Sequence, residues 1–193
     1  MALRIFGLML LILWGCTPPT DRDLQVVTYA QFEEFVQATG YCTEAEEFGW
    51  SIVNVDVFNF HVVEGANWKK PDGMLAPPSK HVPVTQVSYN DALAYCAWSQ
   101  TRLPSYSEYW DLIKEDDRVV ITDHSGPISE ADQVNILGNV WEITSTRQGE
   151  NIRLAGGSLF CSPRTCHGTM PERRLYVDRQ TGNVHIGFAV LKK

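Results

Sequence analysis

The pattern of apolar and polar positions along the chain predicts three helices, each preceded by a residue that can cap its first turn. The first is expected between Thr28, whose hydroxyl can accept from a free backbone N–H while Gln31 reaches back, and Gly40, which supplies a stop. Its apolar positions recur at helical spacing and are Phe32, Phe35 and Val36. This stripe gives the helix one face for a core.

The second and third helices are expected to begin at residues 88–91 (SYND) and 105–108 (SYSE). The inner face of the second helix is expected to hold Leu93, Cys96 and Ala97. The apolar stripe of the third helix is expected to consist of Tyr109, Leu112 and Ile113. Both helices are therefore predicted to pack one side against the same interior.

The rest of the chain is less regular. Residues 53–63 alternate in places and can hold a strand, and short strands are expected at 153–155 and 186–191. Residues 65–83 are rich in Pro, Gly, Lys and Asp and predict a long loop, whereas residues 114–134 are polar and unpatterned. Few helices, short strands and much loop predict a mixed α+β domain.

Length, composition and charge limit the kinds of protein that the chain can be. The chain has 193 residues, 44% of them hydrophobic, which is enough for one domain with a core. Its formal charge of −7 argues against nucleic acid as a partner, because phosphate binding needs clustered Lys and Arg.

The first residues have the pattern of an export signal. Arg4 precedes an apolar run at residues 5–13, and Gly15 and Cys16 follow. Residues 13–16 resemble a bacterial lipobox, so residues 1–15 are expected to be a signal peptide, Cys16 to carry lipid, and residues 16–26 to form a tether. This predicts an exported lipoprotein anchored in a bacterial membrane, on its periplasmic or cell-surface side. The alternative is an ordinary signal peptide with a chance cysteine.

Export favours disulfides among the remaining cysteines. These are Cys42, Cys96, Cys161 and Cys166, and they allow three full pairings among which the sequence does not choose.

Several longer motifs follow one another in a fixed order and carry a family resemblance. They are residues 32–46, 65–73 (GANWKKPDG), 83–98 with VSYNDA at 87–92, 102–105 (RLPS), 135–142 (NILGNVWE) and 156–166 (GGSLFCSPRTC). Together they resemble the formylglycine-generating enzymes, the sulfatase-modifying factor family. The resemblance covers most of residues 27–193.

The resemblance implies an α+β fold that is low in regular secondary structure and distantly similar to C-type lectins. It also implies a reaction. The family uses molecular oxygen and Cu(I) to oxidise a cysteine in an unfolded sulfatase segment with a Cys-x-Pro-x-Arg motif, which produces Cα-formylglycine.

The implied catalytic residues are Cys161, Cys166 and Ser158. The two cysteines have the family's C-x-x-x-x-C spacing, and thiolates are soft ligands that suit Cu(I) and leave a direction open for the substrate thiolate. The resemblance further implies that Trp141 and Arg174 contact substrate. A structural disulfide between the cysteines is the alternative, and the two interpretations are compatible.

A structural calcium site is also implied by the resemblance. Its residues are Asn135, Gly138, Val140 and Glu142. Carboxylate, amide and backbone carbonyl oxygens are the ligands that Ca²⁺ prefers. The alternative is a capped turn without a metal ion.

Some positions depart from the family pattern. His185 and Ala189 stand where the family has asparagine and arginine near the substrate groove, and Thr165 replaces an aromatic residue. The family's partner of the Cys96 position falls at Pro171, so Cys96 is expected to be free or to pair with Cys42. Because of these departures, the alternative function remains that of a non-catalytic binding or scaffold lipoprotein with the same fold. An iron-dependent sulfoxide synthase fits poorly, because no His-x-x-x-His spacing occurs.

Overall fold

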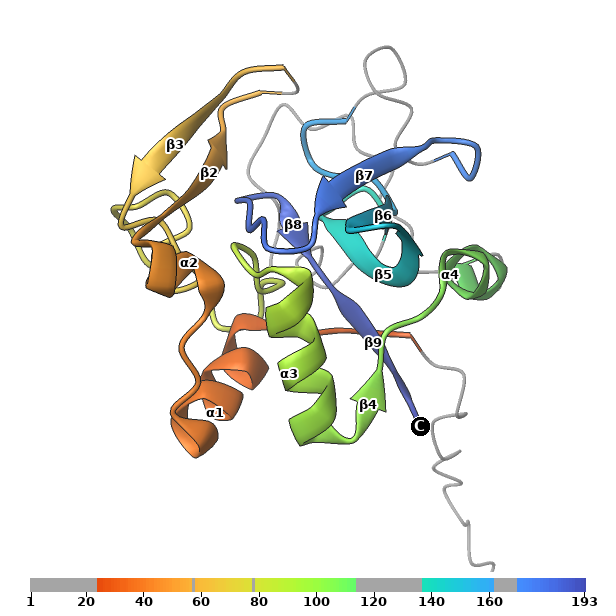
Figure 1. Ribbon diagram of the computed structural model, residues 1–193, viewed down its shortest axis with the longest axis horizontal. Coiled ribbons are helices and arrows are strands. Elements are labelled where there is room, and N and C mark those ends of the chain that lie inside the picture. The colour runs from red at the N-terminus through yellow and green to blue at the C-terminus, as the bar shows by residue number, and fades with distance from the viewer. Residues whose placement is uncertain (1–23, 57, 78, 114–136, 162–169) are drawn as a thin grey trace, which may run out of the picture.

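The computed structural model describes residues 24–56, 58–77, 79–113, 137–161 and 170–193, and Figure 1 shows how their elements are arranged. The helices of this part of the chain are α1 (Tyr29–Thr39), α2 (Glu44–Phe48), α3 (Tyr89–Ser99) and α4 (Tyr106–Ile113). The strands are β1 (Gln25–Val26), β2 (Trp50–Asn54), β3 (Phe60–Glu64), β4 (Thr101–Arg102), β5 (Trp141–Gln148), β6 (Asn151–Ala155), β7 (Leu175–Asp178), β8 (Ile186–Gly187) and β9 (Ala189–Lys192).

The helix starts form as the sequence predicts. Thr28 and Ser88 each accept from the backbone N–H three residues on, and Gln31 and Asp91 reach back to complete capping boxes. Ser105 exchanges the same pair of hydrogen bonds with Glu108 at the start of α4. Three of the four described helices therefore begin where their polar residues indicate.

The strands form three sheets of short elements. β1, β9 and β4 make one antiparallel sheet, β2 and β3 make a hairpin, and β7, β6, β5 and β8 make a four-stranded sheet. Within the last, β8 runs parallel to β5, which pairs Trp141 with Ile186. The mixed α+β prediction is confirmed, and the stretch predicted as one possible strand at 53–63 contains parts of two strands and their connection.

An aromatic cluster lies where α1 and α3 meet the end of the chain. The rings of Phe32 and Tyr95 stack with centroids 6.1 Å apart, and Tyr95 meets Phe188 edge-on at 5.4 Å. Burying each ring contributes on the order of 2 kcal/mol. These rings join α1 and α3 to Phe188, which lies between β8 and β9. Figure 1 shows where these elements lie in the fold.

The inner face of α3 differs from the prediction. Leu93 is 40% exposed and Ala97 is also exposed, whereas Cys96 is buried as expected. The buried positions besides Cys96 are Tyr89, Asp91, Ala92 and Tyr95. Successive helical residues are about 100° apart, so the larger tyrosine rings turn the helix and place Leu93 and Ala97 on its outer side.

Helix α2 and strands β1, β4, β5 and β7 lie outside the elements that the sequence predicts. Helix α2 begins with a capping box at Thr43 and Glu46, the same pattern that identified the other helices. Strand β5 lies partly inside the stretch interpreted as a calcium motif, and its alternation was overlooked.

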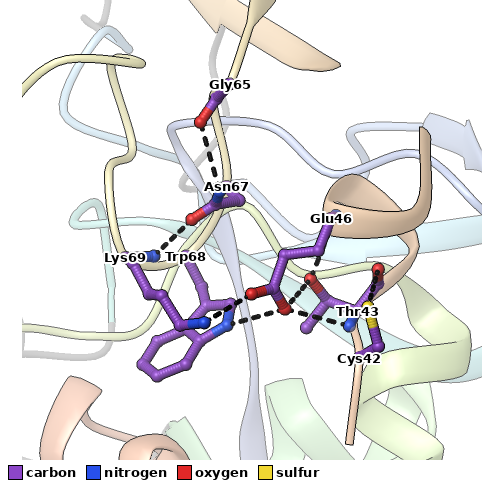
Figure 2. A network of polar contacts seen from close by, with 7 residues as sticks. All are labelled: Cys42, Thr43, Glu46, Gly65, Asn67, Trp68 and Lys69. Carbon is purple, nitrogen blue, oxygen red and sulfur yellow. Dashed lines mark hydrogen bonds and ion pairs between the residues drawn. The ribbon is translucent and has the colours of Figure 1, made fainter. Parts of the chain in front are cut away.

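The loop that follows β3 is tied to α2 through Glu46. Figure 2 shows its carboxylate accepting from the backbone and hydroxyl of Thr43, from the Trp68 indole N–H at 3.2 Å and from the Lys69 ammonium at 2.6 Å. The two nearby hydrogen bonds of Asn67, to Gly65 and from the Lys69 backbone, close the loop on itself. The predicted long loop at 65–83 is therefore an ordered, anchored segment where it is described.

Several predictions fall outside the described residues. They concern the signal peptide, the lipid site Cys16, Asn135, Thr165 and Cys166. Among the described helices, none has the length and apolar character needed to cross a bilayer.

Candidate functional site

Three segments far apart in the sequence meet at the end of the four-stranded sheet. β5 and β6 form an antiparallel hairpin, and the parallel pairing of β8 with β5 brings the segment before Ile186 alongside Trp141. The Trp141 N–H donates to the His185 carbonyl at 2.8 Å. The turn that follows β6 carries Ser158 and Cys161 to the same place.

This turn depends on two glycines. Gly156 and Gly157 have φ angles of 88° and 76°, which L side chains rarely adopt. A Cβ at Gly156 would also collide with the Glu142 carboxylate and the Tyr109 hydroxyl. The glycine pair therefore lets the chain turn tightly over Glu142 before it reaches the candidate site.

Ser158 connects Cys161 to His185. The Ser158 N–H donates to the Cys161 sulfur at 3.4 Å, and the Ser158 hydroxyl lies 3.9 Å from that sulfur and 3.3 Å from His185 Nδ1. Ser158 is fully buried and Cys161 nearly so. The predicted catalytic residues Ser158 and Cys161 are thus brought together, and the structure adds a histidine to them.

His185 is a neutral imidazole at ordinary pH. Burial lowers its pKa to about 4, because the charged form loses hydration without gaining a carboxylate partner. Its ring packs against Phe160 with centroids 5.3 Å apart. A neutral ring nitrogen beside a hydroxyl can accept or donate a hydrogen bond, depending on the tautomer.

A cavity of about 180 Å³ opens beside this cluster. Its lining includes Trp141, Ser158, Cys161 and His185, so the predicted groove tryptophan does face the site. Arg174, also predicted to bind substrate, is exposed and is not part of this lining. The neighbouring side chain that does line the cavity is Arg173.

Glu142 lies beneath the turn and is completely buried. Its Oε2 accepts from the Tyr109 hydroxyl at 3.2 Å, whereas Oε1 has no hydrogen-bond partner among the described residues. Burial raises the pKa of the Glu142 carboxyl well above its usual value. Of the other predicted calcium ligands, Gly138 and Val140 lie on the segment that leads into β5.

Cys161 is disulfide-bonded in this state. Cys42 and Cys96 are not its partner, because both carry free thiols. The alternative in which Cys96 pairs with Cys42 is therefore wrong, and the alternative of a free Cys96 is confirmed. Reduction is needed before the Cys161 sulfur can act as a ligand.

In the sequence, His185 stands out only because it occupies a position where the family has asparagine. Its contact with Ser158 joins residues 27 positions apart, and it follows from the pairing of β8 with β5. Asn183, which donates to Asn54 at 2.8 Å and lines the same cavity, was also missed. Neither residue belongs to a local pattern that would have identified it.

The fold and site define an α+β domain whose short strands present a buried Ser158–Cys161 turn to a cavity. A solved structure with a similar arrangement is PvdO from Pseudomonas aeruginosa, with a TM-score of 0.57 over 86% of this chain and 77% of that one. The sequence identity is 16%, so this likeness concerns the fold alone.

Sequence comparison finds relatives of one family. Residues 23–111 match the sulfatase-modifying factor enzyme 1-like domain. A formylglycine-generating enzyme from Mus musculus is 41% identical over 106 residues, and one from Mycobacterium tuberculosis is 27% identical over 250 positions. The chain is therefore similar to the formylglycine-generating enzymes, most clearly in residues 23–111, and the resemblance seen in the sequence is confirmed.

The extent of these matches differs. The mouse alignment covers 45% of this chain and 28% of that enzyme, whereas the mycobacterial alignment covers 84% and 83%. An inactive C-alpha-formylglycine-generating enzyme 2 from Bos taurus is 38% identical over 109 residues, which are 47% of this chain and 36% of that protein. The family thus includes proteins named as active and as inactive.

Proposed function

We propose that this protein is a copper-dependent oxidase that converts a cysteine of exported sulfatases to Cα-formylglycine. The observation that carries the proposal is the contact of Ser158 with both Cys161 and His185 at the wall of a cavity. Its relatives named formylglycine-generating enzyme support the reaction class. The proposed substrate is an unfolded segment with a Cys-x-Pro-x-Arg motif.

The donor chemistry of the site fits copper(I). The Cys161 sulfur is a soft ligand when it is reduced and ionised, and it lies in a nearly dry setting beside the cavity. In this proposal Cys161 and Cys166 hold the ion, which supplies a soft centre for thiolate sulfur and a route for electrons to oxygen.

The described residues have definite roles in such a site. The Ser158 N–H stabilises negative charge on the Cys161 sulfur by donating to it. His185 offers a neutral ring nitrogen that can hydrogen-bond to the Ser158 hydroxyl or to an incoming thiol. Trp141 forms an apolar wall that keeps water from the sulfur.

We further propose that calcium supports the turn beneath the site. The fully buried Oε1 of Glu142 has no partner among the described residues, and a buried carboxylate oxygen of this kind fits a hard cation. Together with Asn135 and the backbone of Gly138 and Val140, Glu142 would hold the ion and so fix the position of Gly156 above it.

The test measures oxygen consumption by the reduced protein loaded with Cu(I), with and without a Cys-x-Pro-x-Arg peptide. Cys161→Ser is expected to abolish the peptide-dependent consumption and to weaken Cu(I) binding in a competition titration. Cys42→Ser is the matched control, because it removes an exposed free thiol outside the site. Equal activity and copper affinity in both variants would contradict the proposal.

A second candidate function is peptide binding without oxidation. Ala189, which replaces a family arginine, is fully buried and offers no side chain to a ligand. The inactive bovine relative supports this candidate. It predicts that the peptide binds equally well when its cysteine is replaced by serine and that no oxygen is consumed.

A further inference from the structure

The hairpin formed by β2 and β3 exposes an unusual amount of apolar surface. Phe58, Phe60 and Val62 are 75%, 60% and 62% exposed, and Trp50 is 43% exposed. Large exposed apolar side chains of the described residues are concentrated between positions 48 and 75. A contiguous exposed patch of this kind marks an interaction surface more often than a solvated one.

The register places the apolar side chains on one face of the hairpin. Ile52 lies opposite Val62, and Asn54 lies opposite Phe60, so these four residues share a face. Trp50 lies on that face as well, because side chains two residues apart on a strand point the same way. We call this surface the hairpin face: Trp50, Ile52, Asn54, Phe60, Val62 and Glu64, which lies opposite Trp50.

The opposite face is occupied by the protein itself. Ser51 is buried, and its hydroxyl donates to the side chain of Gln86 and the carbonyl of Gly182. A Cβ at Gly73 would collide with the Val63 side chain, so the following loop covers that residue. The hairpin face is therefore the side left for a partner.

The hairpin face continues into the candidate site. Asn54 lines the cavity that contains Cys161, and its side chain accepts from Asn183. Trp50 and Ile52 line a second cavity of about 210 Å³ toward Gly182. The hairpin face therefore borders the candidate site at its Asn54 end and the second cavity at its Trp50 end.

The outer edge of β3 is open to another strand. Among the described elements β3 pairs only with β2, and the backbone of residues 60–62 makes no other backbone hydrogen bond there. In Figure 1, β3 lies at the outer side of the hairpin, away from β8 and β9. An extended peptide can pair with such an edge and place alternate side chains on the hairpin face.

The charge of the region restricts the partner. The hairpin and its connection carry Asp56 and Glu64, and the second cavity has Asp178 as its one charged lining residue. Glu47 precedes the hairpin on α2. Along the hairpin and the second cavity an acidic segment would therefore be repelled and a basic one attracted, whereas a neutral apolar segment would feel neither force.

We propose that the hairpin face binds an extended apolar segment of a client polypeptide, neutral or basic, as an added strand on β3. The proposal rests on the proposed function in one respect, since the segment bound is taken to be the one whose cysteine enters the cavity. The hairpin face then sets which unfolded segments are held long enough to react.

Binding is tested apart from oxidation with a fluorescent peptide in which the reactive cysteine is replaced by serine. The peptide alternates apolar and neutral residues next to that position, and a second version carries acidic residues between the same apolar ones. We expect the neutral peptide to bind at least tenfold more tightly than the acidic one by fluorescence anisotropy. We also expect the amides of Phe60 and Val62, which face the open edge, to gain protection from hydrogen exchange, whereas the amide of His61 faces β2.

The variants separate the outcomes. The double variant Phe60→Ser/Val62→Ser is expected to lose at least tenfold in affinity, whereas Leu93→Ser, which removes an exposed apolar side chain from α3, should bind as the wild type does. Both changes are at exposed positions, and thermal unfolding checks that each variant is folded. Cys161→Ser should keep its affinity, so a failed oxidase and a failed docking surface give different results.

Three results would overturn the proposal. One is equal peptide affinity in the double variant and in Leu93→Ser. Another is peptide binding without protection of the Phe60 and Val62 amides. The third is a double variant that still binds the peptide but no longer self-associates or no longer binds phospholipid vesicles. That result would assign the hairpin face to a second copy of the chain or to a membrane.

Discussion

Replacing His185 by asparagine tests whether the imidazole is held neutral next to Ser158. Burial lowers its pKa to about 4, whereas in the unfolded chain it titrates near 6.5. Between these values the unfolded state binds a proton that the folded state does not, so the stability supplied by the neutral ring is present above pH 6.5 and is lost as the pH falls toward 4. The loss amounts to about 2 kcal/mol between pH 7 and pH 4.5.

His185→Asn should remove this loss, because an asparagine can hydrogen-bond to Ser158 and does not titrate. Urea unfolding at pH 7, 5.5 and 4.5 would measure the difference in free energy of unfolding between variant and wild type. We expect the difference to shift in favour of the variant by about 1 kcal/mol at pH 5.5 and about 2 kcal/mol at pH 4.5. Glu142 titrates in both proteins and cancels. A difference that stays constant with pH would refute the buried neutral histidine.

Three further predictions concern the turn and the buried carboxyl. Gly156→Ala should destabilise the fold by more than about 3 kcal/mol in chemical unfolding, because the alanine would have a strained φ and would collide with Glu142. The control Gly149→Ala, at a glycine with a positive φ but open space around it, should cost only about 1–2 kcal/mol. Equal costs for the two variants would show that the collision with Glu142 is unimportant. Calcium at a hundredfold excess over its Kd should stabilise the wild type by about 2.7 kcal/mol in thermal unfolding and should leave the stability of Glu142→Gln unchanged. An equal gain in stability in both proteins would show that the ion binds elsewhere. Ser158→Ala should cost about 1 kcal/mol of stability and lower oxygen consumption, and unchanged consumption would remove Ser158 from the site.

The parts of the fold that could be predicted are local. Thr28, Ser88 and Ser105 identify helix starts because a capping box needs only residues within one turn. The face of α3 could not be predicted from spacing alone, since Leu93 and Ala97 fit a helical stripe as well as Ala92 and Tyr95 do. The packing of Tyr95 against Phe32 of α1 and against Phe188, which precedes β9, decides between the two stripes.

In the candidate site, too, local features could be predicted from the sequence and contacts between distant segments could not. The turn with Ser158 and Cys161 stands out in the sequence because glycines and cysteines lie close together in it. The contact of His185 with Ser158 and the orphan oxygen of Glu142 depend on the pairing of β5 with β6 and β8, which brings distant segments together. Such juxtapositions exist only in the folded chain.

The histidine at position 185 gives the site hydrogen-bonding groups that differ from those of the family's asparagine. An asparagine would offer an amide there, whereas a neutral imidazole offers one ring N–H donor and one ring-nitrogen acceptor, whose places depend on the tautomer. Its position 3.3 Å from the Ser158 hydroxyl links it to the Cys161 sulfur through one side chain. This arrangement is compatible with thiol oxidation and does not require the family's asparagine.

The most direct test of the account is the mass of the product. The reduced protein, loaded with Cu(I) and supplied with oxygen, is incubated with a Cys-x-Pro-x-Arg peptide, and the peptide is analysed for an aldehyde that an aminooxy reagent captures. The account predicts aldehyde at the cysteine position with the wild type and none with Cys161→Ser. A peptide that stays a thiol, or is only converted to a disulfide, with fully loaded wild-type protein would contradict it.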